Sequence, residues 1–148
     1  MADDSRFFDL EIITPDRVFW SGKASMLEMN TTEGQVGIYK KHIPMTMILQ
    51  PGIVKLHLEN EIKEAAIHAG FVEILPDKIS MMAEVAEWPD EIDLNRAKEA
   101  ELRAERRLQA HDPKINMSRA ELALKRALVR QELAGKLNFI IILTEQKF

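Results

Sequence analysis

Four arginines in the second half of the chain have the spacing needed to bind one anion together. Arg96 and Arg103 are seven residues apart, and Arg126 and Arg130 are four apart, so each pair shares a face if its segment is helical. Guanidinium groups suit phosphate because they donate two parallel hydrogen bonds. Solvated surface charge, supported by neighbouring acids, would explain the same pattern. Spacing alone does not separate these two interpretations.

The segment that carries the first arginine pair is predicted to be a helix. Trp88-Pro89-Asp90 ends the preceding part, because a proline holds its neighbour in extended geometry. Asp93 is a suitable N-cap for the helix that follows. An apolar face then recurs at helical spacing until His111-Asp112-Pro113 interrupts it. This face consists of Leu94, Ala97, Ala104 and Leu108.

A second helix is predicted to carry Arg126 and Arg130. Asn116 or Ser118 can cap its start, and Gly135 indicates its end. Two helices joined by so short a connection pack antiparallel, and small alanines let their backbones approach closely. The apolar stripe of this helix consists of Ala120, Ala123, Leu124, Ala127, Leu128 and Ala134.

Composition excludes several classes of protein. The 148 residues are 46% hydrophobic and contain no cysteine, so disulfides and thiolate metal sites are excluded. The acidic start, Met1-Ala2-Asp3-Asp4, does not resemble a secretory signal. No run approaches the roughly 18 apolar residues of a membrane span. We therefore expect a cytosolic protein without a membrane span, unless a partner holds it at a membrane.

Charge is distributed unevenly along the chain. Residues 1–90 hold 8 basic and 15 acidic side chains, whereas residues 91–134 hold 10 basic and 8 acidic ones. An acidic front and a mildly basic back indicate a chain in two parts. Nothing is basic enough to predict nucleic acid as a partner.

The first ninety residues have the pattern of short strands separated by turns. Alternation of apolar and polar residues, as in Val54 to Leu58, indicates half-buried strands. Many short strands with no long helical pattern predict an antiparallel sandwich or barrel. The predicted strands are 7–13, 18–20, 26–30, 54–58, 62–68, 71–75 and 79–85.

One segment of this part, residues 33–52, has a more specific pattern. It reads Glu-Gly-x-x-Gly-Ile-x-x-x-His-x-Pro, followed by Leu-x-Pro-Gly. The glycines permit positive φ and close approach of the backbone, and the prolines fix extended segments. His42 is interpreted as a hydrogen-bonded loop residue, because no carboxylate or second histidine is spaced to assist it in catalysis. The residues concerned are Gly34, Gly37, His42, Pro44, Pro51 and Gly52.

This segment resembles the signature of the epsilon subunit of F-type ATP synthases. The resemblance extends from residue 7 to about 134, and it includes Phe8-Asp9-Leu10, Ile13-Thr14-Pro15 and Ala69-Gly70-Phe71-Val72-Glu73. It implies an α+β fold in which a flattened antiparallel β-sandwich (residues 1–88) precedes an antiparallel α-helical hairpin (residues 89–135). Residues 136–148 form an apolar tail outside the pattern. Their β-branched run favours a strand or a buried contact.

The resemblance also implies a function without catalysis. In the family the sandwich docks on the gamma subunit and the c-ring through the glycine- and proline-containing motif, and so couples the catalytic core to the ring. The hairpin is mobile: in its extended form it reaches the catalytic alpha and beta subunits and inhibits ATP hydrolysis. The expected location is the cytoplasmic side of the cell membrane, as a peripheral part of the proton-translocating complex.

A subset of the family, best known among bacilli, binds ATP in the folded hairpin, and the residues of that site are present in this sequence. By similarity, Glu87, Ile92, Asp93 and Ala97 would hold the adenosine end. Arg96, Arg103, Arg126 and Arg130 would serve the phosphate end, with or without magnesium. The expected role is sensing, because the chain lacks the Gly-x-x-x-x-Gly-Lys-Ser/Thr loop of many nucleotide hydrolases. The main alternative is a stand-alone protein-interaction module that binds no nucleotide. A small hydrolase is disfavoured, because no residue resembles an activated nucleophile.

Overall fold

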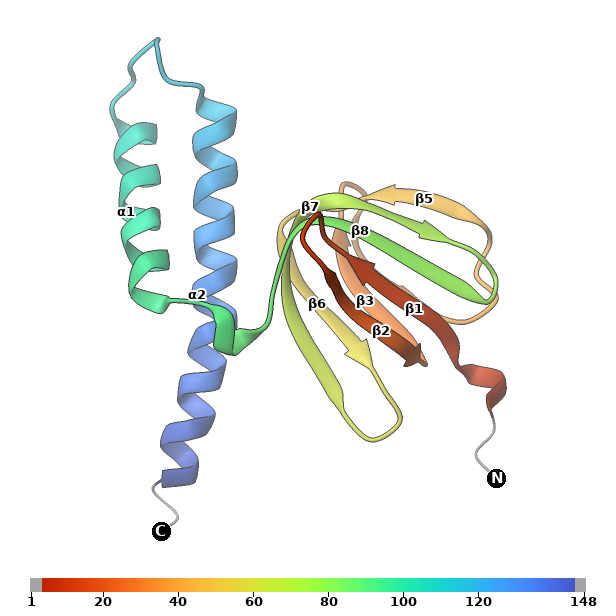
Figure 1. Ribbon diagram of the computed structural model, residues 1–148. Helices are drawn as coiled ribbons and strands as arrows, with labels where there is room; N and C mark the ends of the chain where they lie inside the picture. The colour runs from red at the N-terminus through yellow and green to blue at the C-terminus, as the bar shows by residue number, and fades with distance from the viewer. Residues whose placement is uncertain (1–3, 146–148) are drawn as a thin grey trace. The chain divides into compact units, whose positions relative to one another are not determined.

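The computed structural model describes residues 4–145, with side chains described for residues 5–137. Its contacts divide the chain into two compact units, Met1–Ala86 and Glu87–Phe148 (Figure 1). The first unit consists mainly of strands, after a short 3₁₀ turn at Asp4–Arg6, and the second consists of helices, so the predicted fold class is confirmed. The division lies slightly before the boundary that the sequence indicated after residue 88. Within the described residues, no helix has both the length and the apolar character needed to cross a membrane.

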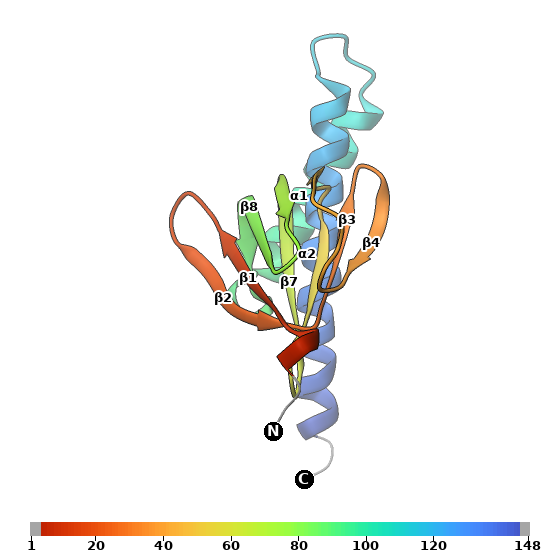
Figure 2. The same ribbon diagram turned by 90° about the vertical axis from the view of Figure 1, so that its right-hand side faces the viewer.

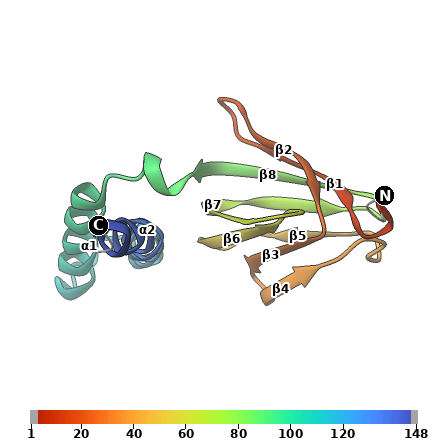
Figure 3. The same ribbon diagram turned by 90° about the horizontal axis from the view of Figure 1, so that it is seen from below.

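The first unit is a sheet that curls into a sandwich. Its strand order is β2-β1-β8-β7-β6-β3-β4, with β5 paired to β7. Figures 2 and 3 show β1, β2 and β8 on one side and β3 and β4 on the other, and in Figure 3 β6 lies on the side of β3 and β4. The strands are β1 (Phe8–Ile13), β2 (Val18–Ala24), β3 (Met26–Thr31), β4 (Gly34–Ile38), β5 (Met45–Ile48), β6 (Gly52–His57), β7 (Ile62–Ile74) and β8 (Lys78–Glu87).

The core of the sandwich comes from the alternation that the sequence displays. In β1, Phe8, Leu10 and Ile12 are buried while Asp9 between them is exposed. The other large side chains that are fully buried in this unit are Leu27, Met29, Leu56, Ile67, His68, Ile74, Ile79 and Met81. One pairing departs from the predicted antiparallel pattern: β1 runs parallel to β8, with Asp9 opposite Lys78. This pairing joins the start of the unit to its end.

Two strands, β4 and β5, lie in the 33–52 segment and were not among the predicted strands. β4 begins at Gly34 (φ 108°) and contains Gly37, and glycine weakens the strand signal. β5 follows Pro44 and is only four residues long, which is too short to display a clear period of two, and three of its four side chains are exposed. It is a strand because it pairs with β7, with Ile48 opposite Phe71. Tertiary pairing therefore determines both elements.

β7 joins two strands that the sequence predicted separately. Its first half pairs with β6 and its second half with β5. Between the halves, Ala69 (φ 64°) and Gly70 (φ 122°) have left-handed backbone conformations, and the Gly70 carbonyl accepts a hydrogen bond from the Leu49 amide at 2.9 Å. The bend lets one strand serve two partners. A Cβ at Gly70 would clash with the Met82 carbonyl oxygen.

The second unit is a pair of antiparallel helices after a short 3₁₀ turn, η2 (Pro89–Glu91) (Figures 1 and 2). Trp88 is extended (ψ 157°), as its place before a proline predicts. The first helix, α1, is Leu94–Gln109, and the Asp93 side chain caps it by accepting from the Arg96 amide at 3.1 Å. Both features confirm the sequence prediction.

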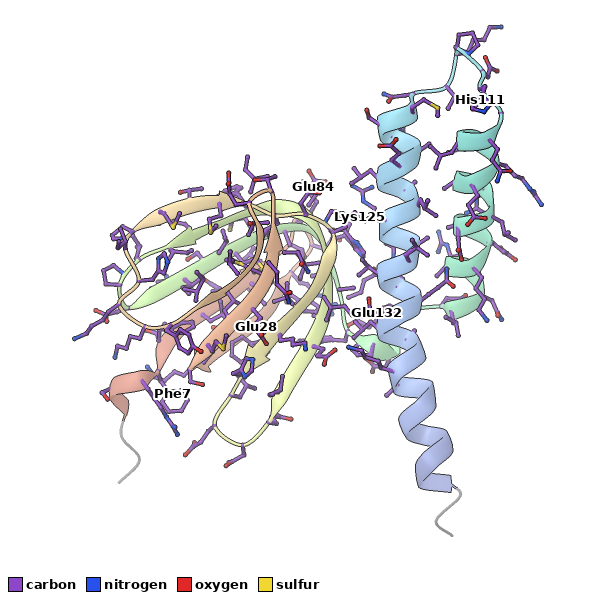
Figure 4. All side chains as sticks on the ribbon, turned by 180° about the vertical axis from the view of Figure 1, so that it is seen from behind. Phe7, Glu28, Glu84, His111, Lys125 and Glu132 are labelled. Carbon is purple, nitrogen blue, oxygen red and sulfur yellow. The ribbon has the colours of Figure 1, made fainter. Side chains whose placement is uncertain are left out.

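The connection between the helices also follows the prediction. His111 (φ 49°) lies in the turn that joins them, as Figure 4 shows. Asn116, one of the two predicted caps, accepts from the Arg119 amide at 3.1 Å and precedes the second helix, α2 (Met117–Glu145). Ser118 lies inside that helix.

The predicted end of the second helix at Gly135 is wrong. α2 continues through Gly135 to Glu145, so the segment predicted as a separate tail with strand preference extends the helix. An established helix gains one hydrogen bond for each residue that it adds, and this gain outweighs the low propensity of a single glycine or of β-branched residues. Residues 146–148 lie outside the described part. The prediction for Leu128 is also wrong, because this residue is 46% exposed instead of buried in the stripe.

Two separate substitutions at the β7 bend should change the free energy of unfolding in opposite directions. Gly70→Ala introduces a clash with the β8 backbone and should lower the free energy of unfolding by about 3 kcal/mol or more. Ala69→Gly removes a left-handed alanine and should raise it by about 0.5 kcal/mol, since the gain exceeds the entropy cost of glycine. Urea unfolding of each variant tests this. Equal changes in the free energy of unfolding for Gly70→Ala and Ala69→Gly would contradict this prediction.

Gly135→Ala should stabilise α2. Nothing lies within 4 Å of a Cβ built at Gly135, and alanine is favoured over glycine in a helix interior by about 1 kcal/mol. Far-ultraviolet circular dichroism during heating should show the helical signal persisting to higher temperature. A lower melting temperature would instead indicate a glycine-dependent end or kink at this position.

Candidate functional site

A polar cavity lies in the second unit, at the start of α1. Its volume is about 320 Å³, which is within the range of small-ligand sites. Three arginines and three carboxylates contribute to it, so its lining combines both charges. The lining residues are Glu87, Glu91, Asp93, Arg96, Ala97, Ala100, Arg103 and Arg130.

Helix α1 supplies one wall. Arg96, Ala100 and Arg103 recur at steps of four and three, which places them on one face of the helix. Ala97 is buried beside them, and its amide donates to the Asp93 carbonyl at 3.0 Å in the first turn. The capping contact of Asp93 fixes where this helix begins. Because the cap fixes the first residue of α1, the local sequence determines where Arg96 and Arg103 lie along the wall of the cavity.

Arg130 reaches the same cavity from α2. Its Nε donates to Glu87 Oε1 at 2.7 Å, and both side chains are more than two-thirds buried. A guanidinium donates through three nitrogens, so its two terminal nitrogens are not used by this bond. Glu87 thus holds Arg130 in place while donors remain for a ligand.

The other two arginines have no such partner. Within the described residues, the side chains of Arg96 and Arg103 make no hydrogen bond or ion pair, and both are exposed. Arginine stays charged in proteins and matches the geometry of phosphate oxygens. The arrangement can therefore bind an anion with exposed oxygens. The described residues that line the cavity are carboxylates, arginines and alanines.

The structure brings together six of the eight residues that the sequence assigned to nucleotide binding: Glu87, Asp93, Arg96, Ala97, Arg103 and Arg130. Ile92 does not line the cavity, although it lies between two residues that do. Arg126 does not line it either, and its Nε is buried without a hydrogen-bond partner among the described residues. Glu91 and Ala100 line the cavity without having been predicted. The helical spacing of Ala100 to Arg96 and Arg103 could have identified it from the sequence. Glu91 lies in the short turn η2, where no periodic spacing relates it to the arginines.

The motif of the first unit has structural roles of its own. Gly34 uses its positive φ at the start of β4, and a Cβ at Gly52 would clash with the Asn30 side chain. His42 Nδ1 lies 2.7 Å from the Ile43 carbonyl oxygen, which agrees with its interpretation as a hydrogen-bonded loop residue. Gly37 lies within β4, Pro44 directly precedes β5, and Pro51 directly precedes β6. These positions shape the strands β4 to β6.

The part of the chain that the structure describes contains no cluster of three or more histidines and carboxylates suited to a metal ion. Glu87, Glu91 and Asp93 line the same cavity but are not such a cluster.

Known proteins match both units. The family model described as the beta-sandwich domain of the ATP synthase delta/epsilon chain matches residues 7–89, and the long alpha-helix domain of the same chain matches residues 90–135. The ATP synthase epsilon chain of Caldanaerobacter subterraneus subsp. tengcongensis is 43% identical over 130 residues, which cover 87% of this chain and 94% of that one. That of Halalkalibacterium halodurans is 41% identical over 128 residues, with coverages of 86% and 96%.

Solved structures agree in fold. A chain of the Euglena gracilis mitochondrial ATP synthase, in a structure of its OSCP, F1 and c-ring, has a TM-score of 0.77 at 20% identity and covers 90% of this chain and 84% of its own. A chain of the Tetrahymena thermophila mitochondrial enzyme, from its central stalk and c-ring, has a TM-score of 0.53 at 14% identity, with coverages of 88% and 95%. The chain therefore belongs to the epsilon-chain family of the ATP synthases, the non-catalytic subunits of the central stalk.

Proposed function

We propose that this epsilon chain senses ATP through the cavity at the start of α1. The observation that carries the proposal is the pair of exposed guanidiniums of Arg96 and Arg103, which have no partner among the described side chains and share one cavity with Arg130. Their positive charges repel each other, so an anion that lies between them lowers the electrostatic energy of the closed hairpin. The triphosphate of ATP provides such an anion, and the acids near Asp93 provide acceptors for an adenine amino group.

The hairpin then works as a two-state switch. The cavity combines residues of α1 and α2, so it exists only while the hairpin is closed. ATP binds the closed form and shifts the population toward it by its differential affinity. When ATP falls, the helices separate from each other, extend toward the catalytic alpha and beta subunits and inhibit ATP hydrolysis.

The first unit serves assembly in this proposal. It docks on the gamma subunit and the c-ring, and it thereby holds the chain as a peripheral component on the cytoplasmic side of the membrane. Its exposed apolar side chains include Tyr39, Ile43, Met45 and Ile48 in and before β5, next to the glycine- and proline-containing motif. Apolar residues gathered in one segment are typical of a surface that another protein covers. Co-purification with gamma distinguishes this role from that of a stand-alone module.

ATP affinity tests the site directly. Arg103→Gln should weaken ATP binding about tenfold to a hundredfold, because it removes a charged hydrogen-bond donor worth about 1.5–3 kcal/mol. Arg107→Gln is the matched control: it removes the same charge one turn along α1 from an exposed position that does not line the cavity. Calorimetric titration of ATP and then ADP into each protein, with and without magnesium, measures the effects. Equal losses in the two variants, or none in Arg103→Gln, would reject the cavity as the site.

Inhibition in the assembled enzyme tests the switch. Catalytic complexes reconstituted with Arg103→Gln should be inhibited at ATP concentrations at which complexes with the unaltered chain hydrolyse ATP freely. The shift should match the loss of affinity, about tenfold or more in ATP concentration, because binding and closure are linked. Hydrolysis rates measured over a range of ATP concentrations show this. If the rates coincide while affinity differs, nucleotide binding does not control inhibition.

A further inference from the structure

A hydrogen bond joins the side chains of Gln131 on α2 and Glu101 on α1 close to the cavity. The Gln131 amide donates from Nε2 to Glu101 Oε2 at 2.6 Å. Both residues are half-buried, and they are thirty positions apart in the chain. A hydrogen bond to a carboxylate is shorter and stronger than one between two neutral groups, and like other hydrogen bonds it is directional.

This hydrogen bond lies next to the cavity but is not part of its lining. Glu101 directly follows Ala100, which lines the cavity, and Gln131 directly follows Arg130. Neither Glu101 nor Gln131 lines the cavity itself. Among the described residues, Arg130 is the only cavity-lining residue from α2, so its place beside Arg103 depends on how α2 is rotated and shifted along α1.

The buried apolar side chains are small on α1 and of mixed size on α2. On α1 they are Ala97 and Ala104, and on α2 they are Ala120, Ala127, Val129, Leu133 and Ala134. Methyl groups pack closely but are not directional, and a small shift along the helix exchanges one alanine contact for a similar one. A directional bond between two longer side chains is suited to select one register.

We propose that Glu101 and Gln131 are positioning residues, which fix the register of α2 on α1 and thereby set the affinity of the cavity for ATP. The nucleotide part of this inference rests on the proposed function, whereas the register part does not. The pair acts through Arg130. It holds this guanidinium at the level of Arg103, so that one triphosphate contacts both helices.

Exchange of the two side chains tests the pair at constant net charge. Gln131→Glu places two carboxylates against each other and should weaken ATP binding at least about tenfold, equivalent to about 1.4 kcal/mol. Glu101→Gln/Gln131→Glu restores a carboxylate–amide bond of reversed direction and should return the affinity to within about twofold of the unaltered chain. Glu101→Gln keeps an amide–amide bond and should have a small effect. Leu128→Glu, at an exposed position of α2, controls for the added charge.

A distance measurement reads the register without nucleotide. The chain has no cysteine, so Lys98→Cys and Glu132→Cys, at exposed positions of α1 and α2, give two unique spin-label sites in the full-length protein. The distance distribution between the labels should broaden in Gln131→Glu and narrow again in the double exchange. Leu128→Glu should leave it unchanged.

The outcomes separate the two proposals. Recovery of both affinity and distance distribution in the double exchange supports the positioning role. If the double exchange stays as weak as Gln131→Glu, or if Gln131→Glu matches the unaltered chain, the positioning role is overturned. If even the unaltered chain fails to bind millimolar ATP, the proposed function fails. The distances then decide the register role alone: recovery in the double exchange supports it, and identical distributions in all variants overturn it.

Discussion

The second unit depends on the close packing of α1 against α2, and both helices carry buried alanines. Ala97, Ala104 and Ala127 are at most 3% exposed, and Ala97 and Ala104 are seven residues apart on one stripe. Larger side chains at these positions would overpack the interface and push the helices apart. Arg130 on α2 would then move away from Arg103 on α1. The composition of the stripe therefore determines whether a cavity with residues from both helices exists at all.

The balance of charged side chains determines which ligands suit that cavity. Three guanidiniums in one small space repel each other, and the carboxylates of Glu87, Glu91 and Asp93 offset part of that repulsion. The acids come from the chain just before α1, where Pro89 shapes a short turn. Two of these acids have specific tasks, since Glu87 binds Arg130 and Asp93 caps the helix. The remaining positive charge is concentrated at Arg96 and Arg103, where a ligand has access.

Sequence reasoning was most successful where local chemistry determines the result. Asp93 and Asn116 are N-caps because their side-chain oxygens accept hydrogen bonds from the amides three residues later. The residue types and their place before a helical pattern are visible in the sequence itself. Six of the residues that the sequence assigned to the candidate site line one cavity, because helical spacing places Arg96 and Arg103 on one face of α1 and Arg130 reaches them from α2. The parallel pairing of β1 with β8, and the strand β5, depend on partners distant in sequence. Gly135 was misjudged because a glycine ends a helix only when its neighbours favour termination, and here α2 continues.

The energies involved explain how a few contacts can set an ATP threshold. A ligand present at a hundred times its dissociation constant stabilises the form that binds it by about 2.7 kcal/mol. One hydrogen bond to a charged group contributes about 1.5–3 kcal/mol. In the proposed function, the bond from Gln131 to Glu101 and the bond from Arg130 to Glu87 therefore each match the effect of the nucleotide in size. A closed hairpin with several more such bonds would remain closed without ATP, and one with neither would open even when ATP is abundant. In the proposed function, these polar bonds and the buried alanines together give the hairpin a balance between closed and open forms that ATP can shift.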